Sequence, residues 1–139
     1  DADGFHSPES VAKMAAGIAL NDVDRAPWLA RLRDLIVSQL RQGAPAVLAC
    51  SALKERYRQL LVGGDERVRI VYLQGAYDLI CDRMAGRTGH YMDPALLEDQ
   101  FQELEEPADA ITEDVTLPVE KIVDDVIDRL GLRAWPHQP

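Results

Sequence analysis

Val68-Arg69-Ile70-Val71-Tyr72-Leu73 is the stretch that decides the fold class, because it is a short apolar run rich in β-branched residues. A second apolar run, Ala46-Val47-Leu48-Ala49-Cys50, is also too short for a helix. Both runs predict buried parallel strands, since a parallel sheet is covered on both faces. A third, shorter strand is predicted over 111–115.

Helical patterns alternate with these predicted strands. Ser7 and Asp24 are predicted to cap the first two helices, and the apolar stripe of the last helix is predicted to be core. The helices are expected over 8–16, 24–42, 53–62, 77–86, 93–104 and 119–130. This alternation predicts an α/β fold with a mostly parallel sheet, in which ligands bind beyond the carboxyl ends of the strands.

Length, charge and cysteine content exclude several classes of function. The chain has 139 residues, enough for one domain, and its formal charge of -9 argues against nucleic acid as a partner. No apolar run is as long as a membrane span, so no membrane partner is expected. Cys50 and Cys81 lack metal-ligand spacing and are expected to be reduced thiols of a cytoplasmic protein.

The first residues, Asp1-Ala2-Asp3-Gly4-Phe5-His6, place two carboxylates and a histidine close together. Carboxylates suit Mg²⁺, which also binds water and substrate phosphates, and a carboxylate can accept a proton from a hydroxyl group. A solvated acidic terminus with a chance histidine is the simpler interpretation. From these residues alone, that interpretation stays open.

Two pairs of cationic residues have helical i,i+4 spacing. Lys54 and Arg58 follow the predicted strand that ends at Cys50, where an α/β sheet places functional groups. Arg83 and Arg87 precede a glycine-containing connection that resembles a lid over a transferring phosphoryl group. Both pairs favour an anionic small molecule, although an exposed basic face or a helix end would also explain them.

Arg25 lies in the first turn of a predicted helix, where the helix dipole disfavours a positive side chain. A carboxylate partner would explain this position. A local ion pair with Asp22 or Asp24 is the alternative, and it would contribute little at the surface.

Over the region from Asp1 to about Leu130, the chain resembles the gluconokinase family, which belongs to the P-loop kinases related to shikimate kinase. The segments that carry the resemblance are Asp1-Ala2-Asp3-Gly4-Phe5-His6, Lys13-Met14-Ala15-Ala16-Gly17-Ile18-Ala19-Leu20-Asn21-Asp22, Asp24-Arg25-Ala26-Pro27-Trp28-Leu29, Cys50-Ser51-Ala52-Leu53-Lys54, Tyr57-Arg58 and Gly89-His90-Tyr91-Met92. The resemblance implies a three-layer P-loop kinase-like fold over 1–131, with a lid at about 87–93 and a tail over 132–139. It also implies transfer of the ATP γ-phosphoryl group to D-gluconate, giving 6-phospho-D-gluconate.

The resemblance also implies roles for individual residues. Asp1 would help to hold Mg²⁺ through water, and Asp3 would orient the accepting hydroxyl as a catalytic residue. Arg83 and Arg87 would approach the ATP phosphates, with Arg87 also catalytic. The residues expected around the sugar acid are Asp3, His6, Arg25, Lys54, Arg58 and His90. A cytoplasmic homodimer is implied as well.

The main departure from the family is that no segment has the phosphate-binding pattern G-x-x-x-x-G-K-[S/T]. In the family this loop precedes the Asp-x-Asp motif, so we expect a βα unit of about 30 residues, with the first strand, the P-loop and the first helix, to be missing before Asp1. The 139 residues alone are therefore expected to be inactive. A second departure is Asp99 before Gln100-Phe101, where the family tends to have serine.

Two alternatives remain at this level. One is a kinase for another small hydroxy acid, because the identity of the sugar acid rests on the resemblance. The other is a noncatalytic binding remnant of such a kinase. Metal-dependent hydrolysis is a weaker candidate, since Asp1, Asp3 and His6 are too few to define a closed metal site.

Overall fold

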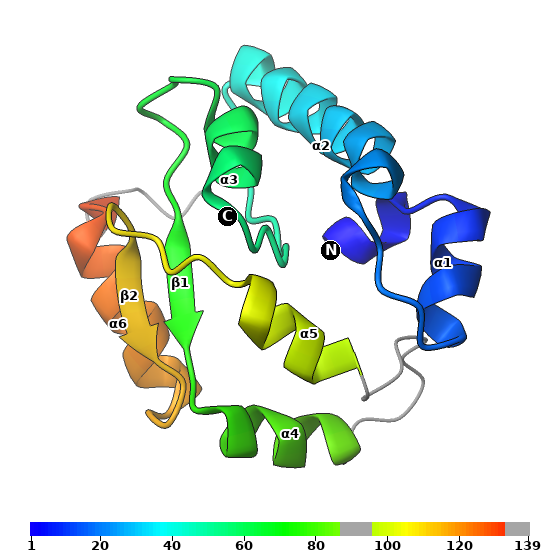
Figure 1. Cartoon of the computed structure of the whole chain (residues 1–139). Helices are drawn as coiled ribbons and strands as arrows, with labels where there is room; N and C mark the ends of the chain where they lie inside the picture. The colour runs from blue at the N-terminus through cyan, green and yellow to red at the C-terminus, as the bar shows by residue number, and fades with distance from the viewer. Residues whose placement is uncertain (87–95, 133–139) are drawn as a thin grey trace.

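The computed structural model describes residues 1–86 and 96–132. Figure 1 follows the chain from the N-terminal helices through the strands to the last helix. The elements are η1 (Ala2–Phe5), α1 (Pro8–Ala15), α2 (Asp22–Gln42), α3 (Glu55–Val62), β1 (Val71–Gln74), α4 (Tyr77–Ala85), α5 (Leu96–Glu103), β2 (Ile111–Asp114) and α6 (Val119–Arg129).

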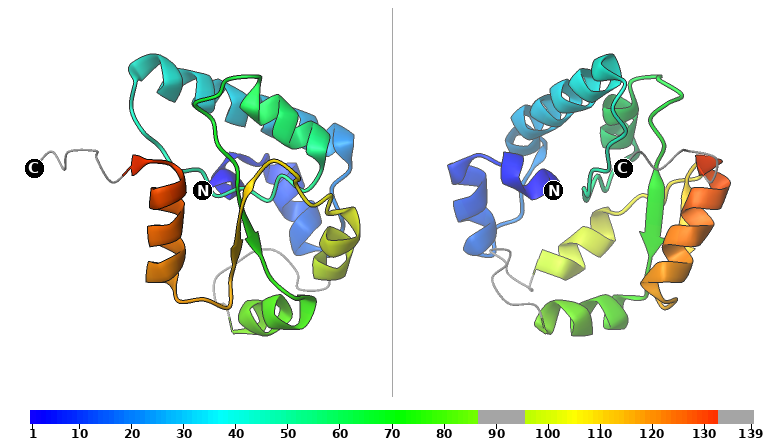
Figure 2. Two further views of the ribbon diagram at one scale, coloured as in Figure 1. Left: turned by 90° about the vertical axis from the view of Figure 1, so that its left-hand side faces the viewer. Right: turned by 180° about the vertical axis from the view of Figure 1, so that it is seen from behind.

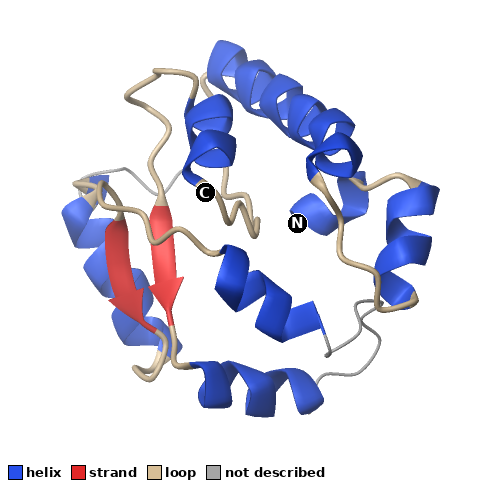
Figure 3. Ribbon diagram, viewed as in Figure 1, coloured by secondary structure: helices blue, strands red, loops and turns tan. Residues whose placement is uncertain are grey.

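The two strands of the described residues pair in parallel, with Val71 opposite Ile111 and Gln74 opposite Asp114. Helix α6 covers one face of this sheet, α3 and α5 lie on the opposite side, and α2 passes across above the strands, which gives three layers (Figures 2 and 3). The predicted α/β class with a parallel sheet is therefore confirmed. The strands are joined through α4 and α5, as a parallel crossover requires.

The prediction of a buried strand over 46–50 is wrong. This segment forms no ladder with either strand, and Val47 is 99% exposed. An apolar run becomes a strand only where a neighbouring strand satisfies its backbone groups, whereas here the Ala49 carbonyl accepts a hydrogen bond from the Ala2 N–H of η1, at 2.8 Å. The predicted burial of the strand over 68–73 is also wrong for part of β1, since Val71 and Leu73 are exposed.

Capping side chains define where the first helices begin. The Ser7 hydroxyl accepts a hydrogen bond from the Ser10 N–H at 3.2 Å, as predicted for α1. Helix α2 is capped by Asn21 rather than by Asp24. Asn21 Oδ1 accepts from the Asp24 N–H at 3.0 Å, and Asp24 accepts in return from the Asn21 N–H at 3.2 Å. The predicted cap was wrong by three positions because Asp24 is the other half of a reciprocal capping box.

The core lies among η1, α2 and α3, away from the sheet. Its buried side chains are Ala2, Trp28, Leu29, Leu32, Tyr57 and Leu61. A second, smaller cluster joins Met14, Leu20 and Leu96. The predicted core stripe of α6 is wrong in this structure, since no residue of α6 is fully buried and Val119 and Val123 are exposed. The best-packed part of the molecule is therefore the part that carries the acidic start of the chain.

Some predicted features fall on residues that the structure does not describe. The lid at about 87–93, which includes Arg87 and His90, lies outside the described residues, as does the tail from 133 to 139. Among the helices of 1–86 and 96–132, none combines the length and the apolar character needed to cross a bilayer.

Candidate functional site

A cavity of about 260 Å³ lies where η1, α2, the segment before α3 and α5 meet. Its polar lining residues are Asp1, Asp3, His6, Arg25, Ser51, Asp99, Gln100 and Glu103. Apolar side chains such as Met14, Leu20, Trp28 and Leu96 complete the wall. Concave sites with an apolar wall and a few convergent polar groups are where small ligands bind. The volume suits a small metabolite.

Local hydrogen bonds fix the acidic start of the chain against this cavity. Asp1 caps the short helix η1, its Oδ1 accepting from the Asp3 N–H at 3.0 Å. Ala2 is fully buried, and two hydrogen bonds hold its backbone. Its carbonyl accepts from Trp28 Nε1 at 2.8 Å, and its N–H donates to the Ala49 carbonyl. With Ala2 held on both sides, Asp1 and Asp3 both line the cavity.

His6 stacks on the indole ring of Trp28, with the ring centroids 4.5 Å apart and the planes 9° from parallel. Burial lowers the pKa of His6, and although Asp3 acts to raise it, the net shift is downward. The ring is therefore neutral at pH 7. Its Nδ1 is buried and has no hydrogen-bond partner among the described residues. A polar ligand in the cavity could satisfy it.

Arg25 has its carboxylate partner, as its position in α2 predicts. The partner is neither Asp22 nor Asp24 but Glu103 of α5, whose Oε2 accepts from Arg25 Nη1 at 2.7 Å. Arg25 Nη1 also lies 3.4 Å from the Tyr57 hydroxyl. Burial works to lower the pKa of Arg25, but these hydrogen bonds outweigh burial and raise it. The guanidinium is thus charged, half-buried and directed into the cavity wall.

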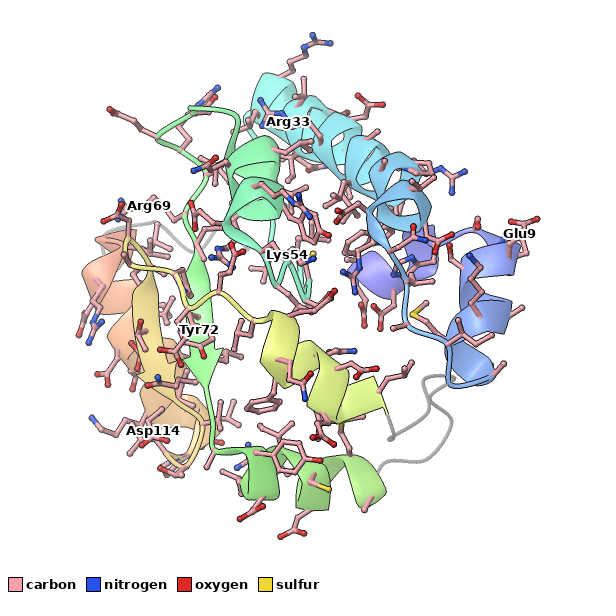
Figure 4. All side chains as sticks on the ribbon, in the orientation of Figure 1. Glu9, Arg33, Lys54, Arg69, Tyr72 and Asp114 are labelled. Carbon is pink, nitrogen blue, oxygen red and sulfur yellow. The ribbon has the colours of Figure 1, made fainter. Side chains whose placement is uncertain are left out.

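Lys54 does not line the cavity but belongs to the same ionic cluster. Its Nζ lies 3.3 Å from Glu103 Oε1 and 3.9 Å from Asp22 Oδ1. Figure 4 shows Lys54 between α3 and α5. Asp22 also accepts from the Tyr57 hydroxyl and from Arg56, and the Tyr57 bond is the main reason why the pKa of Asp22 is lowered. Positive charge is therefore gathered beside the cavity around Tyr57.

Arg58 is buried, and protein acceptors hold its guanidinium. Nη1 donates to the carbonyls of Ala52 at 2.9 Å and Leu53 at 2.8 Å, and Nη2 donates to the Glu105 carbonyl at 2.6 Å. Its side chain is not among those that line the cavity. Arg58 instead fixes the backbone that leads from Ser51 to Lys54. Contact of Arg58 with a substrate stays a prediction.

Arg83, which is predicted to approach the ATP phosphates, lies away from the cavity. Arg83 Nη2 donates to the Val115 carbonyl at 2.8 Å, and Arg83 does not line the cavity. Arg87 and His90 lie outside the described residues. The roles of these three residues toward ATP or substrate stay predictions.

Several lining residues were missed by sequence reasoning, above all Glu103. It stands in no motif, and its partner Arg25 is distant in sequence. Ser51 belongs to a recognised segment but had no assigned role, and the backbone beside it is unusual, since Ala52 has φ of +30°. Positive φ at a residue with a side chain is uncommon and often accompanies binding sites.

The cavity also contains a thiol and a pair of carboxylates whose chemistry can be assessed. Burial raises the pKa of the Cys50 thiol to about 11, so the thiol is protonated and a poor nucleophile at neutral pH. No cluster of three or more histidine, cysteine or acidic residues within 1–86 and 96–132 could hold a metal by itself. Asp1 and Asp3 suit a Mg²⁺ ion whose other ligands are water and phosphate oxygens.

Known proteins resemble this chain over most of its length. No family model matches the chain. The thermoresistant gluconokinase of Escherichia coli K12 is 37% identical over 132 residues, covering 92% of this chain and 75% of that protein.

Solved structures agree in fold. An unliganded sugar kinase from Janibacter sp. HTCC2649 superposes with a TM-score of 0.85 at 38% identity, over 95% of this chain and 78% of that one. A gluconokinase from Sinorhizobium meliloti 1021 gives a TM-score of 0.76 at 34% identity, over 96% of this chain and 80% of that one. The three-layer P-loop kinase-like fold is therefore confirmed, and the chain belongs to the gluconokinase family.

Proposed function

We propose that the cavity is the sugar-acid site of a kinase that transfers the ATP γ-phosphoryl group to D-gluconate, giving 6-phospho-D-gluconate. The observation that carries the proposal is the distribution of charge: Asp1 and Asp3 line the cavity together with the half-buried Arg25. A sugar acid needs a cation for its carboxylate and an acceptor for its reacting hydroxyl. Membership of the gluconokinase family supports gluconate as that acid.

Each polar side chain of the site has a proposed role. Asp3 accepts a hydrogen bond from the attacking hydroxyl, orients it and takes its proton as the phosphoryl group leaves ATP. Arg25 pairs with the substrate carboxylate, assisted by Lys54. The neutral His6 presents its buried Nδ1 to a substrate hydroxyl.

Mg²⁺ bound with ATP would neutralise charge on the phosphates, and Asp1 would help to hold it through water. Arg58 acts through the backbone of Ala52 and Leu53, whose carbonyls it binds. On the family resemblance alone, Arg83 and Arg87 contact the ATP phosphates and His90 contacts the substrate. The same resemblance supports a cytoplasmic homodimer.

Phosphoryl transfer also requires a phosphate-binding loop, and the 139 residues contain no G-x-x-x-x-G-K-[S/T] pattern. The alternative of a protein that binds a sugar acid without phosphorylating it therefore stays open. Binding and transfer must therefore be measured separately.

Calorimetry of the 139-residue protein with D-gluconate tests binding, and ³¹P NMR of the same protein with ATP, Mg²⁺ and gluconate tests transfer. We expect saturable gluconate binding that Arg25→Ala reduces by at least about tenfold, because the carboxylate loses a charged hydrogen bond. We expect no transfer by these 139 residues alone. Appearance of 6-phosphogluconate would establish the kinase and show that the expectation of inactivity is wrong.

A panel of small hydroxy acids, including glycerate and shikimate, separates the remaining alternative. Preference for gluconate supports the proposal. Tighter binding of a different acid would assign the cavity to that acid, and binding of none would contradict a sugar-acid site altogether.

A further inference from the structure

Glu103, the last residue of α5, forms a bridge between two cations at the cavity. Its Oε2 lies 2.7 Å from Arg25 Nη1, and its Oε1 lies 3.3 Å from Lys54 Nζ. Each carboxylate oxygen thus faces a different positive group. Burial works to raise the pKa of this carboxyl, but the hydrogen bonds and charges of Arg25 and Lys54 outweigh burial and lower it. Glu103 is therefore ionised at pH 7.

The three side chains of this bridge differ in exposure. Those of Arg25 and Lys54 are 12% and 21% exposed, whereas that of Glu103 is 32% exposed. Arg25 is further held beside Tyr57, with its guanidinium carbon 5.7 Å from the ring centroid. Glu103 is therefore the member that can leave the bridge without moving the buried framework, because a glutamate at a helix end has rotamers directed to solvent.

We propose that Glu103 is an internal placeholder for the ligand carboxylate: it pairs with Arg25 and Lys54 in the empty protein, and an incoming sugar acid displaces it. The proposal rests on the proposed function, since it takes the ligand to be a sugar acid. Two carboxylates cannot share these two cations closely without repulsion. Binding therefore requires Glu103 to turn away from Arg25.

This exchange makes Glu103 a determinant of specificity. A neutral polyol can occupy the hydroxyl-binding part of the cavity, but it cannot replace a carboxylate between two cations, so Arg25 and Lys54 stay paired with Glu103. An acid replaces one charged pair by another. If Glu103 is paired with Arg25 in about nine-tenths of the empty protein molecules, the apparent Kd for the acid is about tenfold higher than for a site without this pairing.

The test compares Glu103→Gln with a matched control, Glu98→Gln. Glu98 lies on the same helix, is exposed and does not line the cavity, so the control reproduces the change in net charge without altering the cavity. Calorimetry with gluconate should give a Kd about tenfold lower for Glu103→Gln than for the wild type and an unchanged Kd for Glu98→Gln. Binding of sorbitol, the neutral probe, should be the same in all three proteins.

A second arm does not depend on gluconate. Titration with acetate, followed by the NMR resonance of the Arg25 Nε–H, should show about tenfold tighter acetate binding in Glu103→Gln. If gluconate binds no protein while this acetate result holds, the proposed function fails and the placeholder stands. Equal or weaker acetate binding by Glu103→Gln overturns the placeholder, and so does equal or weaker gluconate binding where the wild type binds gluconate, because either result means that Glu103 supports the site instead.

The wild-type protein provides a readout that survives a variant's failure to fold. The ¹³Cδ resonance of Glu103 should move on saturation with an acid, acetate or gluconate, and should not move with sorbitol. An acid that binds without moving this resonance leaves Glu103 on Arg25, and that result also overturns the proposal.

Discussion

At the scale of single residues, the site depends on a few anchors more than on its charged groups. Ala2 is held by Trp28 and Ala49, and this places the carboxylates beside it in the cavity wall. The sequence shows the acidic residues but not the anchors. A tryptophan's hydrogen-bond partner depends on packing between segments distant in sequence.

Trp28→Phe should destabilise the protein by about 1–3 kcal/mol, because the buried Ala2 carbonyl loses its donor and part of the indole volume is lost. Urea unfolding measures the change. Tyr77→Phe is the control, since the Tyr77 ring is exposed and its change should stay within about 0.5 kcal/mol. A Trp28→Phe protein as stable as the wild type would show that the bond to Ala2 contributes nothing.

The cysteines should differ in reactivity. The pKa of Cys50 is about 11 because the thiol is buried, whereas Cys81 is exposed. Since only the thiolate alkylates, iodoacetamide at pH 8 should modify Cys81 first, and Cys50 should react only near pH 11 or after unfolding. Peptide mass spectrometry follows both sites. Rapid modification of Cys50 at pH 8 in the folded protein would contradict this.

At the scale of elements, most helices were predictable and one strand was not. Local capping residues and apolar spacing predict the helices, as Ser7 does for α1. The run 46–50 has the composition of a strand but no neighbouring strand to pair with among the described residues. Strand formation depends on partners distant in sequence, which local composition cannot show.

Asn21→Ala should destabilise the protein by about 1 kcal/mol, because the Asp24 N–H at the start of α2 loses its acceptor. Asn21→Ser should be close to the wild type, since the hydroxyl can accept the same hydrogen bond. Thermal unfolding of the three proteins measures the difference. If alanine and serine behave alike, the capping box does not stabilise α2.

At the scale of the whole molecule, the cavity collects side chains from segments far apart in the chain. Asp3 and Arg25 were both expected around the sugar acid from the family resemblance, and both line the cavity, whereas Ser51 lines it without having been assigned a role. Glu103 was not expected, because nothing local distinguishes it from other acidic residues of α5. A residue that pairs with two cations can be recognised only once those cations are placed.

We propose that this cavity, and no other part of the described surface, binds the sugar acid. A second cavity provides an internal comparison, lined by Gln59, Val62, Gly64, Val68, Arg69, Ile70 and Asp109. Amide chemical shifts in ¹H–¹⁵N NMR during titration with D-gluconate test the claim directly. We expect saturable shifts at Asp3, His6, Arg25, Ser51 and Glu103, with the second cavity unaffected. Saturable shifts confined to the second cavity, or no saturable shifts at all, would contradict it.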